Sequence, residues 1–180
     1  MRKMVAMSIL PDVIEMDLEI VFCGTAVGNA SARRGAYYAG PGNAFWPTLH
    51  KVGLTPRLFL PEEYRGLLEL RMGLTDLAKE VSGNDCDLSR LGFDQQRLRA
   101  LVLQYRPRIL AFTSKRAAEE FVGRKVEYGA LEERVGETVL FVLPSPSGAA
   151  RRFWSEEPWK ELSNLRRLLR KKDANEAGCR

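Results

Sequence analysis

The chain has 180 residues and a formal net charge of +5, from 28 basic and 23 acidic side chains. A chain of this length is expected to form one domain with a real hydrophobic core. Its positive charge is compatible with a nucleic-acid partner, but many basic proteins bind none. No apolar run approaches the roughly 20 residues that a membrane helix needs, so no membrane span is expected.

The cysteines and the single histidine argue against several kinds of site. Cys23, Cys86 and Cys179 are odd in number and lack metal-ligand spacing, so neither a disulfide framework nor a zinc site is expected. They favour a reducing, cytoplasmic setting, and the amino-terminal stretch lacks the cleavage site of a secretory signal. Because His50 is the only histidine, a His-based catalytic triad and a His-rich metal site are not expected either.

Apolar patterning predicts strands that alternate with helices, which is typical of a parallel sheet covered by helices on both faces. A short apolar segment, Met72–Leu77, ends near Asp76, and the composition of Ser82–Ser89 is that of a loop. Ser114 is placed to cap a helix. The predicted strands are Leu18–Cys23, Arg108–Thr113 and Thr138–Leu143. The predicted helices are Asn43–Val52, a short one within Pro56–Leu70 that starts at Pro61, Phe93–Arg106, Lys115–Val122 and a last one that opens at Ser155.

One stretch, Ile20–Gly53, suggests a binding site. It predicts a strand, a loop of about nineteen residues and then a helix, and loops of that length are uncommon unless they are functional or disordered. Ligands of such sheets bind beyond the carboxyl ends of the strands, so the loops after Cys23, Thr113 and Leu143 are expected to converge. The loop's aromatic, basic and amide side chains suit a flat heterocycle attached to phosphate: Arg33, Arg34, Tyr37, Tyr38 and Asn43.

The glycines of this loop match neither GxGxxG nor GxxxxGK[ST], which disfavours dinucleotides and nucleoside triphosphates. The loop after the third strand, PSPSGAARR, offers hydroxyls, backbone amides and two arginines that could contact phosphate. Basic residues after that strand fit either a phosphate-contacting surface or a solvated helix face and tail. They are Arg151, Arg152, Lys160, Arg166, Arg167, Arg170, Lys171 and Lys172.

Three segments, GTAVGNASARRGAYYAGPGNAFW, GLTDLAKEV and LPSPSGAARRF, resemble the mismatch-specific uracil/thymine DNA glycosylases of the uracil-DNA glycosylase superfamily. The resemblance runs from Leu10 to Phe153, and its most specific pieces are YAGPGNAFW and PSPSG. It implies an α/β fold, a three-layer α/β/α domain with a central, mainly parallel sheet. A single domain over residues 1–172 and a flexible tail over 173–180 are expected. The resemblance also implies action on DNA without a metal or other cofactor.

Roles follow from the resemblance position by position. Asn43 matches an asparagine that is thought to be catalytic in a hypoxanthine-acting branch, and Tyr38 matches a residue that stacks over the base. Lys115 matches a basic residue near the DNA backbone. The pocket floor would be formed by Gly24, Thr25 and Ala26, phosphate would be gripped by Ser145 and Ser147, and the loop inserted into the duplex would be Gly148, Ala149, Ala150 and Arg151.

The chain also departs from the family pattern. The first motif is usually GINPG, whose asparagine helps to hold the attacking water, whereas this chain has GTAVG and therefore Ala26. The usual histidine of the second motif is absent too. The small Ala149 and Ala150 leave any plug of the duplex to Arg151 or Arg152.

Other polar groups must therefore do the chemistry, or the protein binds without cutting. Asn43 and Asp76 are the candidate catalytic residues, and each could instead cap a helix or turn. Arg34 could contact phosphate or be solvated, Tyr38 could stack on the base or simply pack, and Asp85 fits an exposed loop. Ser145 is a further polar candidate, whereas helix core is the natural place of Trp46.

The predicted function is a monofunctional glycosylase of base excision repair that removes uracil, with double-stranded DNA as the expected substrate and the monomer as the expected state. Two alternatives stay open. One is a non-catalytic protein that binds uracil or abasic sites in DNA, and the other is a glycosylase with a different base choice, such as hypoxanthine.

Overall fold

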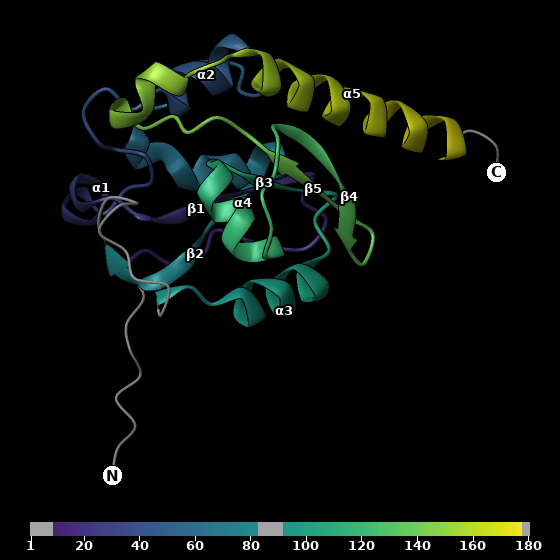
Figure 1. Cartoon of the computed structure of the whole chain (residues 1–180). Helices are drawn as coiled ribbons and strands as arrows, with labels where there is room; N and C mark the ends of the chain where they lie inside the picture. The colour runs from purple at the N-terminus through teal and green to yellow at the C-terminus, as the bar shows by residue number, and fades with distance from the viewer. Residues whose placement is uncertain (1–8, 83–91, 178–180) are drawn as a thin grey trace.

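The computed structural model describes residues 9–82 and 92–177. A five-stranded sheet, in the order β2-β1-β3-β5-β4, forms its centre (Figure 1). Neighbouring strands are parallel except β4 and β5, which are antiparallel, so the predicted α/β fold with a mainly parallel sheet is confirmed. The strands are β1 (Ile20–Val27), β2 (Met72–Ser82), β3 (Ile109–Phe112), β4 (Gly129–Val135) and β5 (Thr138–Val142).

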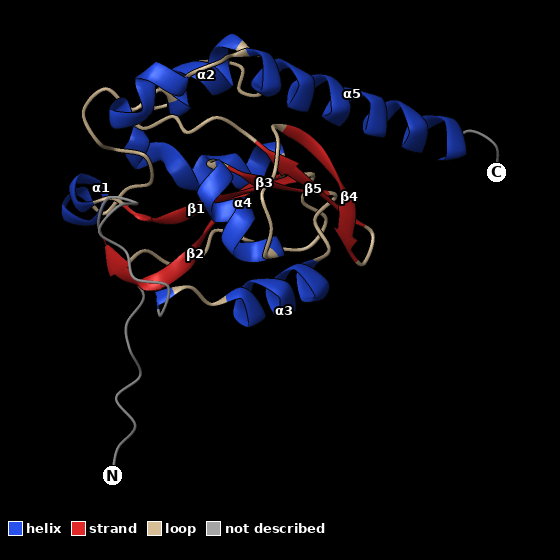
Figure 2. Cartoon of the chain, in the orientation of Figure 1, coloured by secondary structure: helices blue, strands red, loops and turns tan. Residues whose placement is uncertain are grey.

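Helices cover both faces of the sheet, which gives three layers (Figure 2). One face carries α2 (Phe45–Lys51), the 3-10 helix η1 (Pro61–Leu70) and α5 (Glu157–Ala177). The other face carries α3 (Gln95–Tyr105) and α4 (Lys115–Val122). Two short helices lie in the connections near the carboxyl ends of strands: α1 (Asn29–Arg34) after β1, and η3 (Gly148–Phe153) after β5.

Strand periodicity explains the two apolar layers, because successive side chains of a strand point to opposite faces. Phe22 of β1 packs edge-on against Phe45 of α2, with ring centroids 5.2 Å apart, and stacks near Trp159 of α5. Its neighbours Val21 and Cys23 belong to the core on the α3 and α4 side. A cluster of buried apolar residues packs against each face of the sheet. This packing holds the ends of the strands in fixed positions.

Several local expectations are confirmed. The helix Lys115–Val122 has the predicted bounds, and the Ser114 side chain accepts a hydrogen bond from the Ala117 amide at 3.0 Å as its cap. Trp46 lies in the core, 3% exposed. The described part of the chain contains no helix that is both long and apolar enough to span a membrane.

Other expectations are wrong in extent or type. The loop after the first strand is not structureless, since β1 continues to Val27 and α1 follows at once. The segment around Asp76 is an eleven-residue strand, β2, instead of a short run that ends there. The short helix predicted to begin at Pro61 does begin there, but it is the 3-10 helix η1, and β4 was not predicted. Most of the predicted Ser82–Ser89 loop, with Asp85, lies outside the described residues.

A buried carboxylate ties α5 to the start of β1. Glu19, 3% exposed, accepts hydrogen bonds from Arg166 at 2.5 Å and from Arg170 at 2.6 Å. Burial alone would raise the pKa of Glu19, but these two arginines outweigh it and hold that pKa below 4.5. Two of the basic residues near the carboxyl terminus are therefore structural, and they lie at the amino edge of the sheet, opposite the predicted site.

We predict that Glu19→Gln lowers the free energy of unfolding by about 3–5 kcal/mol, because it leaves the buried Arg166 without its counter-ion. Urea unfolding of the whole chain measures the change. The matched control is Glu133→Gln, which removes one partner of the exposed Arg124–Glu133 pair and should change stability little. Because the Glu19 pKa is lowered by folding, its contribution is present above pH 4.5 and is lost as the pH falls further. An unfolding midpoint equal to that of the control would contradict this role.

Candidate active site

The carboxyl edge of the sheet is stepped. β1 pairs with β3 only as far as Cys23, opposite Phe112, and β3 pairs with β5 only as far as Phe112. β1 and β2 continue as a two-stranded ribbon to Val27, opposite Ser82. From Gly24 onward, β1 therefore has a strand partner on one side only.

Asp76 lies on this ribbon, directly opposite Gly24 in the parallel register. Its side chain is 3% exposed and its Oδ2 lies 3.4 Å from the Lys79 ammonium. Burial raises the pKa of Asp76 to about 6, and Lys79 opposes that rise. Asp76 is thus a buried carboxylate in the middle of a strand, and the expectation that it could cap the next turn is wrong.

Lys79 is the centre of an ion network that was not predicted from the sequence. Its ammonium donates to the Tyr37 hydroxyl at 2.9 Å and lies 3.2 Å from Asp12 Oδ1, in addition to Asp76. Asp12 also receives Arg97 Nη1 at 2.8 Å, and Arg97 donates to the Asp76 carbonyl at 2.5 Å. Two carboxylates and two cations from three parts of the chain therefore cluster around the middle of β2.

Gly24 is where the network meets the carboxyl edge. A Cβ atom at this position would lie 2.7 Å from Asp76 Oδ1 and 3.5 Å from the Tyr38 hydroxyl. Thr113 Oγ1 would be 3.8 Å away, and it shares a hydrogen bond of 3.0 Å with the Tyr38 hydroxyl. Asp76 Oδ1 thus packs against Gly24, where β1 meets Tyr38 of the loop before α2 and Thr113 at the end of β3, as the predicted convergence of loops requires.

Tyr38 and Asn43, the first and last residues of the YAGPGN segment, are held by different contacts. The Tyr38 ring stacks on Phe45, with centroids 3.8 Å apart and planes at 15°, and its backbone has a left-handed φ of 53°. Asn43 Oδ1 accepts the Phe45 amide at 3.0 Å, one residue before the cap of α2. No hydrogen bond joins Asn43 to Asp76 in the parts of the chain that the structure describes.

The other predicted pocket residues lie near Gly24. Thr25 is buried, and its hydroxyl shares a hydrogen bond of 3.0 Å with Ser114, so it ties β1 to the start of α4. Ala26 pairs with Ala78 of β2 and offers only its backbone as a polar group. These contacts leave Asp76 as the acidic side chain closest to Gly24.

Two of the predicted DNA-binding cations are already paired. Arg34 forms an ion pair with Glu62 and donates to the Ala39 carbonyl at 2.8 Å, and Lys115 pairs with Glu127 at 2.7 Å. Arg33, Arg151 and Arg152 are exposed, and the described structure shows no ion pair for them. These three cations lie at the carboxyl edge, and Arg33 was considered in the sequence only as part of the long loop.

The loop after β5 packs against the GPGN segment. The Pro146 carbonyl accepts the Ala44 amide at 2.8 Å, and a Cβ atom at Gly148 would lie 3.0 Å from the Pro41 carbonyl oxygen. Ser145 and Ser147 stabilise the turn through bonds to the amides of residues 147 and 149, respectively. The segment 148–151 belongs to η3 and is not an extended wedge; the most exposed apolar side chain there is Phe153, at 69%.

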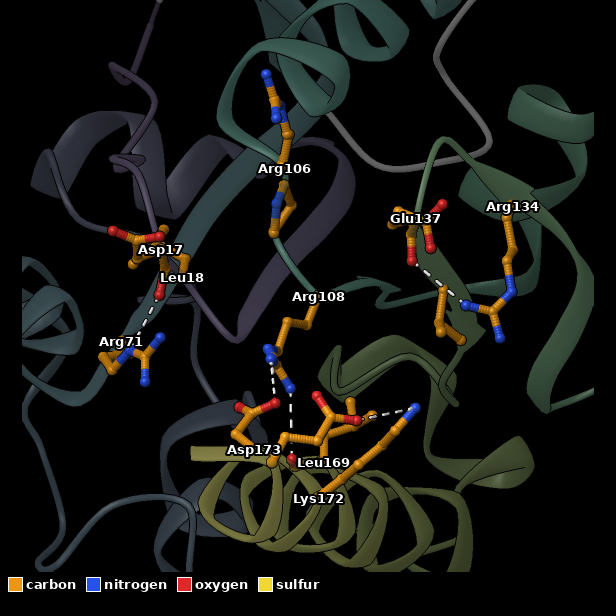
Figure 3. A pocket seen from close by; sticks show the side chains of 13 residues that line it. Asp17, Leu18, Arg71, Arg106, Arg108, Arg134, Glu137, Leu169, Lys172 and Asp173 are labelled. Carbon is orange, nitrogen blue, oxygen red and sulfur yellow. Dashed lines mark hydrogen bonds and ion pairs between the residues drawn. The ribbon is translucent and has the colours of Figure 1, made fainter. Parts of the chain in front are cut away.

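A cavity of about 470 Å³ lies at the opposite, amino edge of the sheet, beside α5 (Figure 3). Arg108 points toward α5 and pairs with Asp173 at 2.6 Å, while Arg134 donates to the Glu137 carbonyl at 3.3 Å. Five basic and four acidic residues line it, so its charge is nearly balanced. Size alone therefore does not make it the reactive site, since the ends of the parallel strands and the buried carboxylate are at the other edge.

A metal centre has no candidate within residues 9–82 and 92–177, where no group of three or more His, Cys, Asp or Glu side chains could hold an ion. The free Cys23 is fully buried, and burial next to Asp76 raises the pKa of its thiol. A raised thiol pKa does not suit a nucleophile. The chemistry of the site therefore centres on Asp76 and its polar neighbours.

Comparison with known proteins identifies a related family and a related structure. The family model described as the uracil DNA glycosylase superfamily matches residues 11–169. A solution NMR structure of a candidate uracil DNA glycosylase from Methanosarcina acetivorans is similar, with a TM-score of 0.59 and 25% sequence identity. That match covers 89% of this chain and 96% of the other.

We predict that Gly24→Ala lowers the free energy of unfolding by about 1–3 kcal/mol, because the new methyl group would overlap the fixed Asp76 carboxylate. Gly28→Ala is the matched control, since a Cβ atom there meets nothing within 4 Å. Denaturant unfolding measures both. The loss in free energy of unfolding caused by Gly24→Ala should be smaller in a chain that also carries Asp76→Ala. An equal loss in the wild type and in Asp76→Ala would show that the contact with Asp76 is not responsible.

Proposed function

The chain belongs to the uracil DNA glycosylase superfamily, and we propose that it hydrolyses the N-glycosidic bond of uracil in DNA, double-stranded DNA being the expected substrate. The observation that carries this proposal is the buried Asp76 carboxylate beside the side-chain-free Gly24 at the carboxyl edge. It supplies a reactive polar group in a chain whose first motif has Ala26 in place of the usual asparagine.

The proposed reaction is a hydrolysis. A glycosylase takes its target base out of the stack and into a pocket, and the proposed position of the base is beside Gly24. Water adds to C1′ of the sugar, the C1′–N1 bond breaks with its electron pair leaving on the base, and Asp76 accepts a proton from the water. Asp76 can do so only as a carboxylate. Because its pKa is about 6, activity is expected to fall as the pH drops through that value.

Tyr38 and Asn43 are the proposed base-binding side chains. Phe45 occupies one face of the Tyr38 ring, so a flipped base would stack on the opposite face and extend a rigid pair. The Asn43 Oδ1 atom already accepts the Phe45 amide, which leaves its NH₂ group to donate to the departing base. Donors placed where charge develops lower the barrier most in a site that excludes water.

The proposed enzyme is monofunctional, which means that it releases the base by hydrolysis and does not cleave the sugar through a lysine. A lysine that cleaved the sugar would need a free amine, whereas the Lys79 ammonium contacts the Tyr37 hydroxyl and two carboxylates. A group held in this way has no lone pair to attack C1′. Water therefore remains the proposed nucleophile.

DNA is the proposed partner, held at the carboxyl edge. Arg33, Arg151 and Arg152 have no carboxylate partner in the described structure, so they are available to phosphates, in contrast to Arg34 and Lys115. The turn at Ser145–Ser147 adds hydroxyl and backbone groups, of the kind that contact phosphates in protein–DNA interfaces.

The first test is excision from end-labelled DNA that contains one uracil, read as strand breaks after alkali. We predict cleavage by the wild type, and a loss of about 100- to 10,000-fold in the single-turnover rate for Asp76→Asn. Asn43→Ala should lower the rate about 100- to 1,000-fold, because it removes a donor to the departing base.

Asp173→Asn is the control for this test, because Asp173 is an acidic residue of the opposite edge. A tight gel shift without alkali-labile product, on uracil and inosine substrates alike, would favour a binding protein that does not cut. Cleavage of inosine DNA alone would show a changed base choice. Normal rates in both Asp76→Asn and Asn43→Ala would remove these residues from the chemistry.

Arg151 provides a separate test of the DNA surface. We predict that Arg151→Ala weakens DNA binding at every sequence and lowers the slope of log K against log salt by about one, because one phosphate contact is lost. Gel shifts at several salt concentrations measure this. Lys172→Ala, at the opposite edge, should leave both quantities unchanged, and an unchanged slope for Arg151→Ala would show that Arg151 does not contact phosphate.

A further inference from the structure

Lys79 is a buried cation next to the proposed catalytic carboxylate. Its side chain is 8% exposed, and its ammonium lies between Asp76 Oδ2 at 3.4 Å and Asp12 Oδ1 at 3.2 Å. The ammonium also donates a hydrogen bond to the Tyr37 hydroxyl at 2.9 Å, and this hydroxyl donates to the Pro11 carbonyl. Lysine is rarely buried without partners, so these three oxygens account for its position.

The network separates the two oxygens of Asp76. Oδ2 faces Lys79, while Oδ1 is the atom that a Cβ at Gly24 would meet at 2.7 Å. One oxygen is therefore held by a cation, and the other lies against Gly24, on the side of the carboxylate where the proposed base and water would bind. The two oxygens are chemically equivalent, so the contact with the ammonium fixes the orientation of the carboxylate plane and keeps one oxygen against Gly24.

We propose that Lys79 is a positioning residue, which turns Asp76 Oδ1 toward the pocket and keeps this buried carboxylate ionised for the reaction. The inference rests on the proposed hydrolysis, and it adds a residue that does not touch the substrate. Asp12 has the balancing role: it anchors the Lys79 ammonium from the other side, but its own negative charge opposes ionisation of Asp76.

Charged and titratable groups reach Asp76 from every element packed around it. Lys79 comes from its own strand, Asp12 from the segment before β1 and Arg97 from α3. Cys23 of β1 and Tyr37 from the loop before α2 are coupled to it through its charge. Lys79 and Arg97 favour the carboxylate and Asp12 disfavours it, so substitutions of Lys79 and Asp12 should act in opposite directions.

The test compares the pH dependence of single-turnover excision in Lys79→Met, Lys79→Arg and Asp12→Asn. In Lys79→Met, the pH at which the excision rate falls on the acid side should rise by about one to three units, because the nearest cation is lost. This fall at low pH is called the acid limb. The plateau should fall as well, since the carboxylate is free to rotate. Lys79→Arg, which keeps the charge, should leave the limb near that of the wild type, and Asp12→Asn should move it to lower pH. A similar fall in rate at every pH, with the limb unmoved, would reduce Lys79 to a structural role and overturn the proposal.

A second measurement keeps this outcome separate from the fate of the proposed function. The Asp76 carboxyl carbon can be titrated by NMR in chains labelled with ¹³C at aspartate, without any substrate. The upward shift in Lys79→Met and the downward shift in Asp12→Asn are expected even if the wild type excises nothing. If Lys79→Met does not fold, the titration of Asp12→Asn still tests the proposal. An Asp76 pKa that is unchanged or raised in Asp12→Asn would contradict the proposed roles of Lys79 and Asp12.

Discussion

The pairing of Asp76 with Lys79 is the interaction on which the architecture of the carboxyl edge depends. A carboxylate that is 3% exposed must be matched by positive charge and hydrogen bonds, or it becomes neutral. Lys79 meets this need from the same strand, and it needs a second acid in turn, which Asp12 supplies from the segment before β1. Gly24 then completes the constraint, because only a residue without a side chain leaves room for Asp76 Oδ1.

Rigidity around this network comes from the two apolar cores. Phe22 and Phe45 lock β1 to α2, and Tyr38 is stacked on the same Phe45 ring. The position of a base-stacking ring is therefore set by the core packing of its neighbour. At the other edge of the sheet, Glu19 fixes α5 through Arg166. The fold thus uses buried ion pairs at both edges, one of which serves architecture and the other, in our proposal, chemistry.

Much of the fold could be predicted from the sequence because its signals are local. Apolar runs marked β1, β3 and β5, and Ser114 marked the start of α4. β4 could not be predicted in this way, since five of its seven residues are at least partly exposed and it lacks a continuous apolar run. The extension of β2 was missed because Asp76 and Lys79 look like solvent-facing residues in a pattern, and only their mutual pairing allows burial.

The location of the candidate site could be predicted from the sequence, but the ion pairs and hydrogen bonds within it could not. The convergence of loops and the motif residues Tyr38, Asn43 and Asp76 were visible in the chain, whereas the ion pairs around Asp76 join residues as far apart as Asp12 and Arg97. Asp76 itself pairs only with Lys79 in the described structure, while Asp12 pairs with Lys79 and Arg97, and nothing in local spacing indicates that Asp12 meets Lys79. Likewise, the pairing of Arg34 with Glu62 depends on how η1 folds back, so sequence alone could not tell which arginines stay unpaired.

The step in the carboxyl edge has a consequence for how such a chain can diversify. The ribbon of β1 and β2 that carries Gly24, Asp76 and Lys79 projects beyond the ends of β3 and β5, while the arginine-bearing turn follows β5 and packs against the GPGN segment. Replacing the exposed arginines of that turn would change the proposed grip on DNA without altering the surroundings of the carboxylate. The two properties can therefore change one at a time within one small domain.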